Sequence, residues 1–208
     1  MAATASGAPS PPAPPWARPF ASPARRAAWA RRSLFALAAC DLVVAITGPA
    51  ANGPAPALVE VLFAIGSVGA FGALIACAIS VPAWCHRVYR NLPALGVHAT
   101  RFTPGWAAGW WFVPLFNLVR PYQVLREIWV DSRTKSEGWL LLKRGWALFL
   151  VGGFLSDCTL TTSDAHFDAG LNSVLNSLGW LLRAGGALTA AAIVGRVTRW
   201  HLERAANP

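Results

Sequence analysis

The sequence is short of charge, and acidic side chains are the scarcer kind. Charged residues make up 13% of the 208 positions, with nine Asp and Glu against eighteen Lys and Arg. Hydrophobic residues reach 55%, whereas soluble domains carry about 25% charged residues. The net charge of +9 would suit nucleic-acid binding, but no zinc-finger spacing, RNP motif or basic reading helix accompanies it. The composition instead favours a membrane protein, in which basic residues flank apolar segments.

The motifs that usually mark catalysis or cofactor binding are also missing. No P-loop, G-x-G-x-x-G, G-x-S-x-G or H-E-x-x-H sequence occurs. The four histidines are scattered, and no two of the four cysteines form a C-x-x-C pair. The aspartates at 157, 164 and 168 do not have the spacing of a calcium loop. We therefore expect no metal site, no cofactor and no enzymatic activity.

Long apolar runs are present, and they predict an all-α, polytopic membrane helix bundle. From Val61 to Cys85 the chain has 25 consecutive residues without a charge, which as a helix exceeds the roughly 30 Å of bilayer hydrocarbon. The predicted transmembrane helices are about residues 33–51, 58–84, 138–158 and 172–197. Residues 1–30 form a Pro/Ala-rich tail that we expect to be disordered and cytoplasmic. Residues 31–208 are then the integral membrane domain.

The basic residues predict how these four segments are threaded. Lys and Arg cluster before the first, between the second and third, and after the fourth, but the loops 51–56 and 159–168 contain none. The positive-inside rule therefore places both termini in the cytoplasm. Only Arg183 departs from this pattern. The remaining basic residues are expected to face the anionic lipid headgroups of the cytoplasmic leaflet. No protein partner is identified.

An aromatic element lies between the second and third predicted helices. Residues 104–119 are uncharged and rich in tryptophan, but the run barely spans a bilayer and is interrupted by Pro114. Because basic residues flank both of its ends, a re-entrant or interfacial element on the cytoplasmic face fits better than a crossing, which remains the alternative. Pro121 suits the first turn of a following cytoplasmic helix over about residues 121–135.

Two charges fall near the middle of predicted transmembrane helices. Asp41 lies in the first and Arg183 in the fourth. A charge at that depth costs about 2.5–3.5 kcal/mol on insertion scales and needs a partner. We expect the two side chains to approach each other. The pair would either hold the helices in register or form part of a path for a solute or proton.

Two ordered motifs carry a family resemblance. The first runs from Trp84 to Gly96 and the second from Pro104 to Gln123, followed by the sequence Arg-Glu-Ile-Trp at 126–129. Together they resemble the bacterial multi-pass membrane family known as domain of unknown function 4328, over about Leu58 to Arg199. The resemblance implies an integral bacterial membrane protein, so we expect the chain in a bacterial cytoplasmic (inner) membrane. It implies no activity and carries no catalytic residues with it.

The same motifs supply the candidate residues of a cytoplasmic site, which are Trp84, Arg87, Arg90, Asn91, Asn117, Arg120, Glu127 and Trp129. Arg87 and Arg90 share a helical face, and we expect one of them to lie against Glu127. Asn117 is expected to bond backbone groups that the nearby prolines leave free. These contacts would either fasten the aromatic element to the bundle or form a working surface.

The leading prediction is a non-enzymatic scaffold or regulatory component that acts through this cytoplasmic Arg/Trp surface. The alternative is a small transporter or channel subunit that uses Asp41 and Arg183. Transport would require a polar cavity that connects these two residues, whereas a scaffold would require an accessible basic surface. The three-dimensional arrangement of the helices distinguishes between these requirements.

Overall fold

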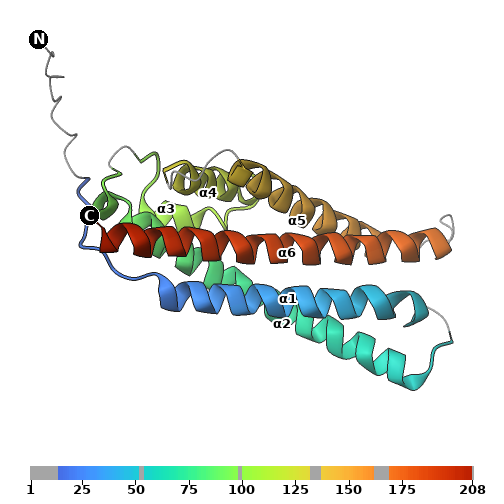
Figure 1. Ribbon diagram of the computed structural model, residues 1–208. Helices are drawn as coiled ribbons and strands as arrows, with labels where there is room; N and C mark the ends of the chain where they lie inside the picture. Colours follow the sequence, from blue (N-terminus) through green and yellow to red (C-terminus); the bar gives the residue numbers. More distant parts are fainter. Residues whose placement is uncertain (1–13, 52–53, 98–99, 132–136, 162–168, 208) are drawn as a thin grey trace, which may run out of the picture.

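A computed structural model describes residues 14–51, 54–97, 100–131, 137–161 and 169–207, and within them every regular element is a helix. Four helices are long: α1 (Ala24–Ala51), α2 (Ala57–Asn91), α5 (Glu137–Thr161) and α6 (Ala169–Ala206). Short elements join α2 to α5: η1 (Pro93–Leu95), α3 (Pro104–Gly109), η2 (Phe116–Leu118) and α4 (Arg120–Asp131). The start of α1, the end of α6, α3 and α4 all lie at one end of the molecule (Figure 1).

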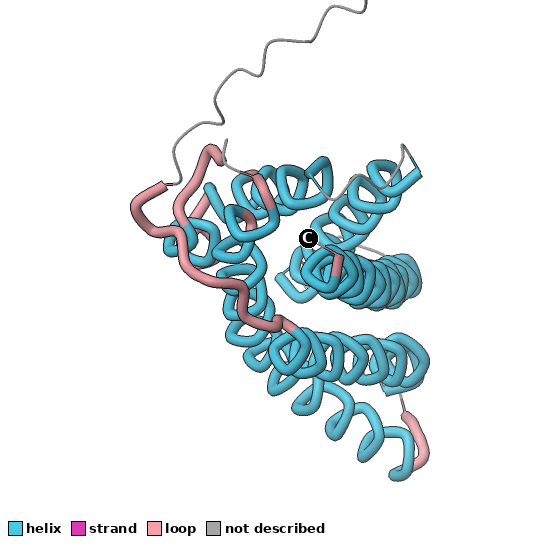
Figure 2. Tube along the Cα trace, turned by 60° about the vertical axis from the view of Figure 1, so that its left-hand side comes forward, coloured by secondary structure: helices cyan, strands magenta, loops and turns pink. Residues whose placement is uncertain are grey.

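The long helices pack in the order α2, α1, α6, α5. Helix α1 lies along both α2 and α6, and α5 packs along the other side of α6 (Figure 2). Among the described residues, α2 and α5 share no extended interface. The arrangement is therefore a curved row of antiparallel helices, with α3 and α4 beside the gap between its two outer members.

Three of the long helices, α1, α2 and α6, are long and apolar enough to cross a membrane. This confirms the all-helical class and a chain with helices capable of spanning a bilayer. Helix α5 carries Glu137, Lys143, Arg144 and Asp157 and is not one of the three. Large apolar side chains are exposed on the outer faces of all four helices, among them Ile46, Val68, Phe71, Ile79, Phe154 and Leu188. Such surfaces suit contact with lipid.

Small residues bring neighbouring helices into close contact. A Cβ added to Gly152 would lie 2.5 Å from the backbone nitrogen of Arg183, so the backbones of α5 and α6 touch there. On α2, Gly69 lies against Cys40 of α1, since an added Cβ would approach the Cys40 sulfur to 2.8 Å. These close approaches are the packing that small residues allow between membrane helices. Gly72 has no neighbour within 4 Å and faces outward.

The helix boundaries differ from those expected at both ends of the chain. Helix α1 begins at Ala24, so the arginines expected before the first transmembrane helix belong to its first turns. Helix α6 continues to Ala206. Residues 14–23 lie against the end of α2, where the Trp16 and Tyr89 ring centroids are 6.2 Å apart. Residues 1–13 of the expected tail and 132–135 of the expected cytoplasmic helix lie outside the described residues.

The aromatic element is broken at its centre. Phe116 donates its backbone N–H to the Pro114 carbonyl at 2.8 Å, which closes a γ-turn on Leu115. Leu115 has φ of +64°, a conformation that a branched side chain adopts only at a cost of about 1–3 kcal/mol. Helix α3 precedes the turn and η2 follows it. The proline and the turn explain why residues 104–119 do not form one continuous helix.

Candidate functional sites: a buried ion pair and a basic hollow

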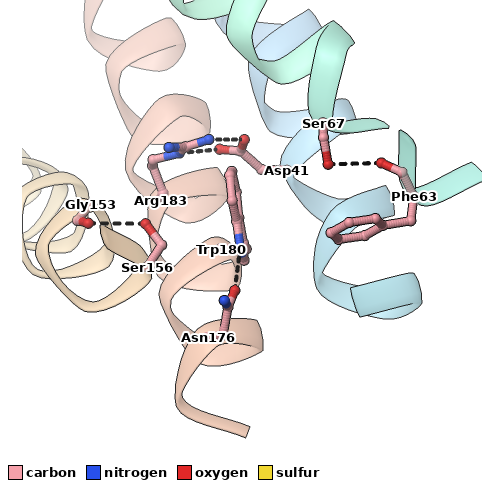
Figure 3. A network of polar contacts seen from close by, with 8 residues as sticks. All are labelled: Asp41, Phe63, Ser67, Gly153, Ser156, Asn176, Trp180 and Arg183. Atoms are coloured by element: carbon pink, nitrogen blue, oxygen red, sulfur yellow. Dashed lines mark hydrogen bonds and ion pairs between the residues drawn. The ribbon is translucent and has the colours of Figure 1, made fainter. Parts of the chain in front are cut away.

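The Asp41 carboxylate and the Arg183 guanidinium meet between α1 and α6 (Figure 3). Arg183 donates from Nε to Oδ2 at 2.9 Å and from Nη2 to Oδ1 at 2.6 Å. Asp41 is fully buried and Arg183 is 8% exposed. The two parallel hydrogen bonds match the planar fork of arginine to both carboxylate oxygens, which is the strongest geometry for such a pair.

An aromatic ring also lies against the flat face of the Arg183 guanidinium. The Arg183 guanidinium carbon lies 4.1 Å from the centroid of the Trp180 ring, and the Trp180 indole N–H donates to the Asn176 side-chain oxygen (Figure 3). The aromatic face adds a cation–π contact. Removing either charge would leave the other buried without a partner, which costs about 3–5 kcal/mol. This geometry favours a structural role, because each group satisfies the other.

A second group of arginines lines an open hollow at the end of the molecule where α1 begins. We call it the basic hollow, and it is formed by Ser22, Arg25, Arg26, Trp29 and Arg87. Arg26 donates to the Ala83 carbonyl at 3.0 Å and is close enough to Arg87 and Arg90 for their charges to act on it. Among the described residues, none of these arginines forms an ion pair. The hollow is thus a concentration of uncompensated positive charge.

The structure brings Arg87 and Arg90 to Arg26 of α1 and not to Glu127, which corrects the contact expected from the sequence. The Glu127 carboxylate accepts instead from the backbone N–H of Arg101 at 2.7 Å. Arg87 and Arg90 extend from α2 toward the start of α1. Glu127 lies on α4 and faces the segment that leads into α3. Glu127 therefore fastens the segment that leads into the aromatic element, through the backbone of Arg101.

Asn117 does not act as the expected anchor either. Its side chain is exposed and makes no hydrogen bond within the described part of the chain, while its backbone N–H donates to the Val113 carbonyl at 2.9 Å. The backbone around the γ-turn forms its hydrogen bonds without the Asn117 side chain. The indole N–H of Trp146 on α5 donates to the Leu118 carbonyl at 2.9 Å and fastens the element from the opposite side.

The other candidate residues are placed in packing roles. Trp84 is fully buried and donates to Thr198 Oγ1 at 3.0 Å, which joins α2 to α6. Trp129 is buried on α4. Arg120 lies over the rings of Trp110 and Phe116, at 5.3 and 5.8 Å from their centroids. Of these residues, Arg120 contacts the aromatic element directly, whereas Trp84 joins two long helices.

Asn91 makes a contact that sequence reasoning did not assign. Its side-chain amide donates to the Ala21 carbonyl at 2.8 Å and accepts from the Ala21 N–H at 3.2 Å. One amide thus pairs with both backbone groups of a residue 70 positions away and holds the segment before α1 against the end of α2. The lone asparagine in the motif was the signal, but nothing in the sequence identified its partner.

Several other contacts had no sequence signal. The hydroxyl groups of Ser33 and Ser80 are 2.7 Å apart between α1 and α2, and both residues are buried. The Tyr89 hydroxyl accepts from the backbone N–H of Phe102 at 2.8 Å. Serine and tyrosine are unremarkable in a membrane helix, so only the packed structure reveals these partners.

Metal ligands do not gather in the part of the chain that the structure describes. Within it, no group of three or more His, Cys, Asp or Glu side chains could hold a metal ion. The aspartates at 164 and 168 lie outside the described residues.

Comparison with known proteins gives the chain a family. No curated protein and no solved structure matches it. The family described as domain of unknown function (DUF4328) matches residues 55–199, which include both motifs, the aromatic element and Arg183. The basic hollow is only partly covered, since Arg87 is inside the match and Arg25 and Arg26 precede it. The chain belongs to the family of domain of unknown function 4328.

Proposed function

We propose that this protein is a non-enzymatic scaffold or regulatory component of the bacterial cytoplasmic membrane, with four crossings and both termini in the cytoplasm. Its working surface is the basic hollow. The observation that carries the proposal is the cluster of arginines around this hollow with no acidic side chain paired to them in the described residues. Guanidinium groups left free at a membrane surface are suited to bind a carboxylate-rich partner.

The position of α5 supports a fourth crossing. It runs antiparallel to α6, from the end that holds α3 and α4 to the opposite end (Figure 1). Its 25 residues exceed the roughly 30 Å of hydrocarbon at 1.5 Å per residue. Lys143 and Arg144 lie near its first turns, where long basic side chains reach back to the membrane surface.

The aromatic element supports a re-entrant rather than a crossing segment. Residues 93–131 begin and end at the same end of the molecule (Figure 1). Hydrogen bonds within the protein satisfy backbone groups around the γ-turn, since the Asn117 N–H donates to the Val113 carbonyl and the Leu118 carbonyl accepts from Trp146 of α5. Exposed Phe112, Leu115 and Phe116 are suited to the interface with lipid.

Reporter fusions test the topology. Fusions at Asn52 and Asp164 should read as external, and fusions at Arg133 and after Pro208 as internal. An external reading at Arg133 would make residues 104–119 a true crossing. The basic hollow and α4 would then lie on opposite sides of the membrane.

Photocrosslinking tests the scaffold. A photoreactive phenylalanine in place of Trp29, which lines the hollow and is 46% exposed, should form a discrete adduct with an acidic cytoplasmic protein in cells. Arg25→Gln combined with Arg87→Gln should abolish the adduct. Arg196→Gln combined with Arg199→Gln changes the charge equally at the same end and should leave it unchanged. Adducts with phospholipid alone, or adducts insensitive to Arg25 and Arg87, would refute the scaffold.

A further inference from the structure

A cavity of about 250 Å³ lies in the gap between α2 and α5. The curved row of helices creates this gap, since α2 and α5 are its outer members and share no extended interface in the described residues. Helix α6 forms the back wall, and the aromatic element covers the cytoplasmic end with Trp111, Phe112 and Leu118. The basic hollow shares no lining residue with this cavity.

Small residues are among those that line the cavity: Ala78 of α2, Gly145 of α5, and Gly186 and Ala190 of α6. A Cβ added to either glycine would collide with the neighbouring helix, so these glycines allow α5 and α6 to pack closely behind the cavity. Asp41 and Arg183 do not line it. The walls are almost entirely apolar, so a polar solute would find few groups to bond and an apolar one would be accommodated.

The mouth of the cavity faces the surroundings of the bundle. Leu74, Ala78, Phe112 and Leu118 line the cavity and are themselves exposed. On either side of this mouth the surface of α2 carries exposed Ile75 and Ile79, and that of α5 carries exposed Val151 and Phe154. In a membrane, the molecules that meet such a mouth are lipid chains. Its volume lies below the roughly 300–1,000 Å³ of sites that enclose a whole drug-sized ligand, so it suits one portion of a longer molecule.

Polar recognition is available only at one end. Asn117 lines the cavity with a side-chain amide that forms no hydrogen bond in the described residues. Arg120 follows the cavity-lining Leu118 by two residues, and within the described chain it has no acidic partner. Arg120 is held in place by the Trp110 and Phe116 rings and by a 3.1 Å hydrogen bond to Gln123. A cation and a free amide beside an apolar cavity complement an anionic headgroup on an acyl chain.

We propose that this cavity binds one acyl chain of an anionic phospholipid, with the headgroup at Asn117 and Arg120. A chain that leaves the bilayer for the cavity exchanges one apolar environment for another and gains only packing contacts. The headgroup contacts therefore select which lipid stays. The site rests on the membrane placement of the proposed function but uses a different surface from the basic hollow.

Native mass spectrometry tests the site. The full-length protein is reconstituted with equal amounts of phosphatidylglycerol and phosphatidylethanolamine, extracted in mild detergent, and the retained lipids are counted. The wild type should keep one phosphatidylglycerol. Ala78→Trp, which fills the mouth from an exposed position, should reduce retention about tenfold or more. Ile79→Trp adds the same ring to the adjacent outward-facing residue and should retain lipid as the wild type does.

A second variant tests the headgroup. Arg120→Gln should reduce the preference for phosphatidylglycerol about fivefold, the effect of one basic residue near an anionic group, whereas Arg196→Gln should not. Equal retention by the Ala78 and Ile79 variants, or equal retention of the two lipids by the wild type, would overturn the proposal. The Arg25/Arg87 double variant should retain lipid normally, so failure of the scaffold and failure of this site are separate results.

Discussion

Arg183 and the arginines of the basic hollow are the same residue type in opposite surroundings. Arg183 lies within the bundle with both fork nitrogens on Asp41 and a tryptophan ring against its face. Arg25 and Arg87 line an open hollow at the end of the bundle, and neither forms an ion pair with a described residue. The charge of Arg183 is paired inside the protein. The charges of Arg25 and Arg87 have no acidic partner among the described residues, so they remain available to a ligand.

The physical reason for the difference is solvent. A charge inside the bundle has no water to stabilise it, so its partner must be part of the protein. An arginine at the membrane surface is hydrated and tolerates the lack of a partner at little cost. Substitutions in the two regions should therefore have opposite consequences, with loss of folded protein in one and loss of binding in the other.

The largest effect is expected at the buried pair. Asp41→Leu and Arg183→Leu should each destabilise the protein by about 3–5 kcal/mol, because each leaves an uncompensated buried charge. The double substitution to leucine should restore most of the loss. The measurement is the amount of folded protein and its thermal unfolding in detergent.

The double variant is the control for simple loss of packing. If its loss equals the sum of the two single losses, the two side chains do not stabilise each other, and the contrast between the two regions disappears.

A smaller loss is expected where α2 meets α6. Trp84→Phe keeps most of the buried ring but leaves the Thr198 hydroxyl without its donor, which should cost about 1–3 kcal/mol. Thr198→Val in the same protein removes the orphaned group and should recover part of that loss. Thermal unfolding of the single and double variants measures the effect. No recovery in the double variant would mean that ring packing, and not the hydrogen bond, sets the cost.

A local effect is expected at Asn91. Asn91→Ala removes both hydrogen bonds to Ala21, so residues 14–23 should detach from α2 and chymotrypsin should cleave faster after Phe20. Asn117→Ala is the matched control, since its side chain makes no hydrogen bond in the described structure, and cleavage after Phe20 should remain unchanged. Equal cleavage in both variants would show that Asn91 does not hold the segment.

The smallest effect on stability is expected in the basic hollow. Arg25→Gln combined with Arg87→Gln should change the free energy of unfolding by no more than about 0.5 kcal/mol, the usual range for surface substitutions. The same variant should lose its crosslinked partner. A large destabilisation would show that these arginines, like Arg183, stabilise the folded protein.

The buried pair was the part of the site that sequence could predict. Asp41 and Arg183 stand alone in apolar runs, and a lone charge in such a run must find a partner, so two of opposite sign are expected to meet. The contact expected between Arg87 or Arg90 and Glu127 was wrong, because near the surface several charges compete and sequence distance does not decide among them. Asn91 and Ala21 lie 70 residues apart, and no periodic pattern connects them.

The sequence by itself determined the helical class, the presence of helices able to span a membrane and the family, because apolar runs, charge distribution and ordered motifs are local properties of the chain. Only the tertiary structure decided that the long helices form a row, that α2 and α5 stay apart around a cavity, and that the aromatic element covers one end of it. Those features depend on which helix faces meet. Close helix contact at Gly152 and Gly69 selects some neighbours over others, and in an apolar medium such packing is decided by the shape of the whole surface and not by hydrophobicity.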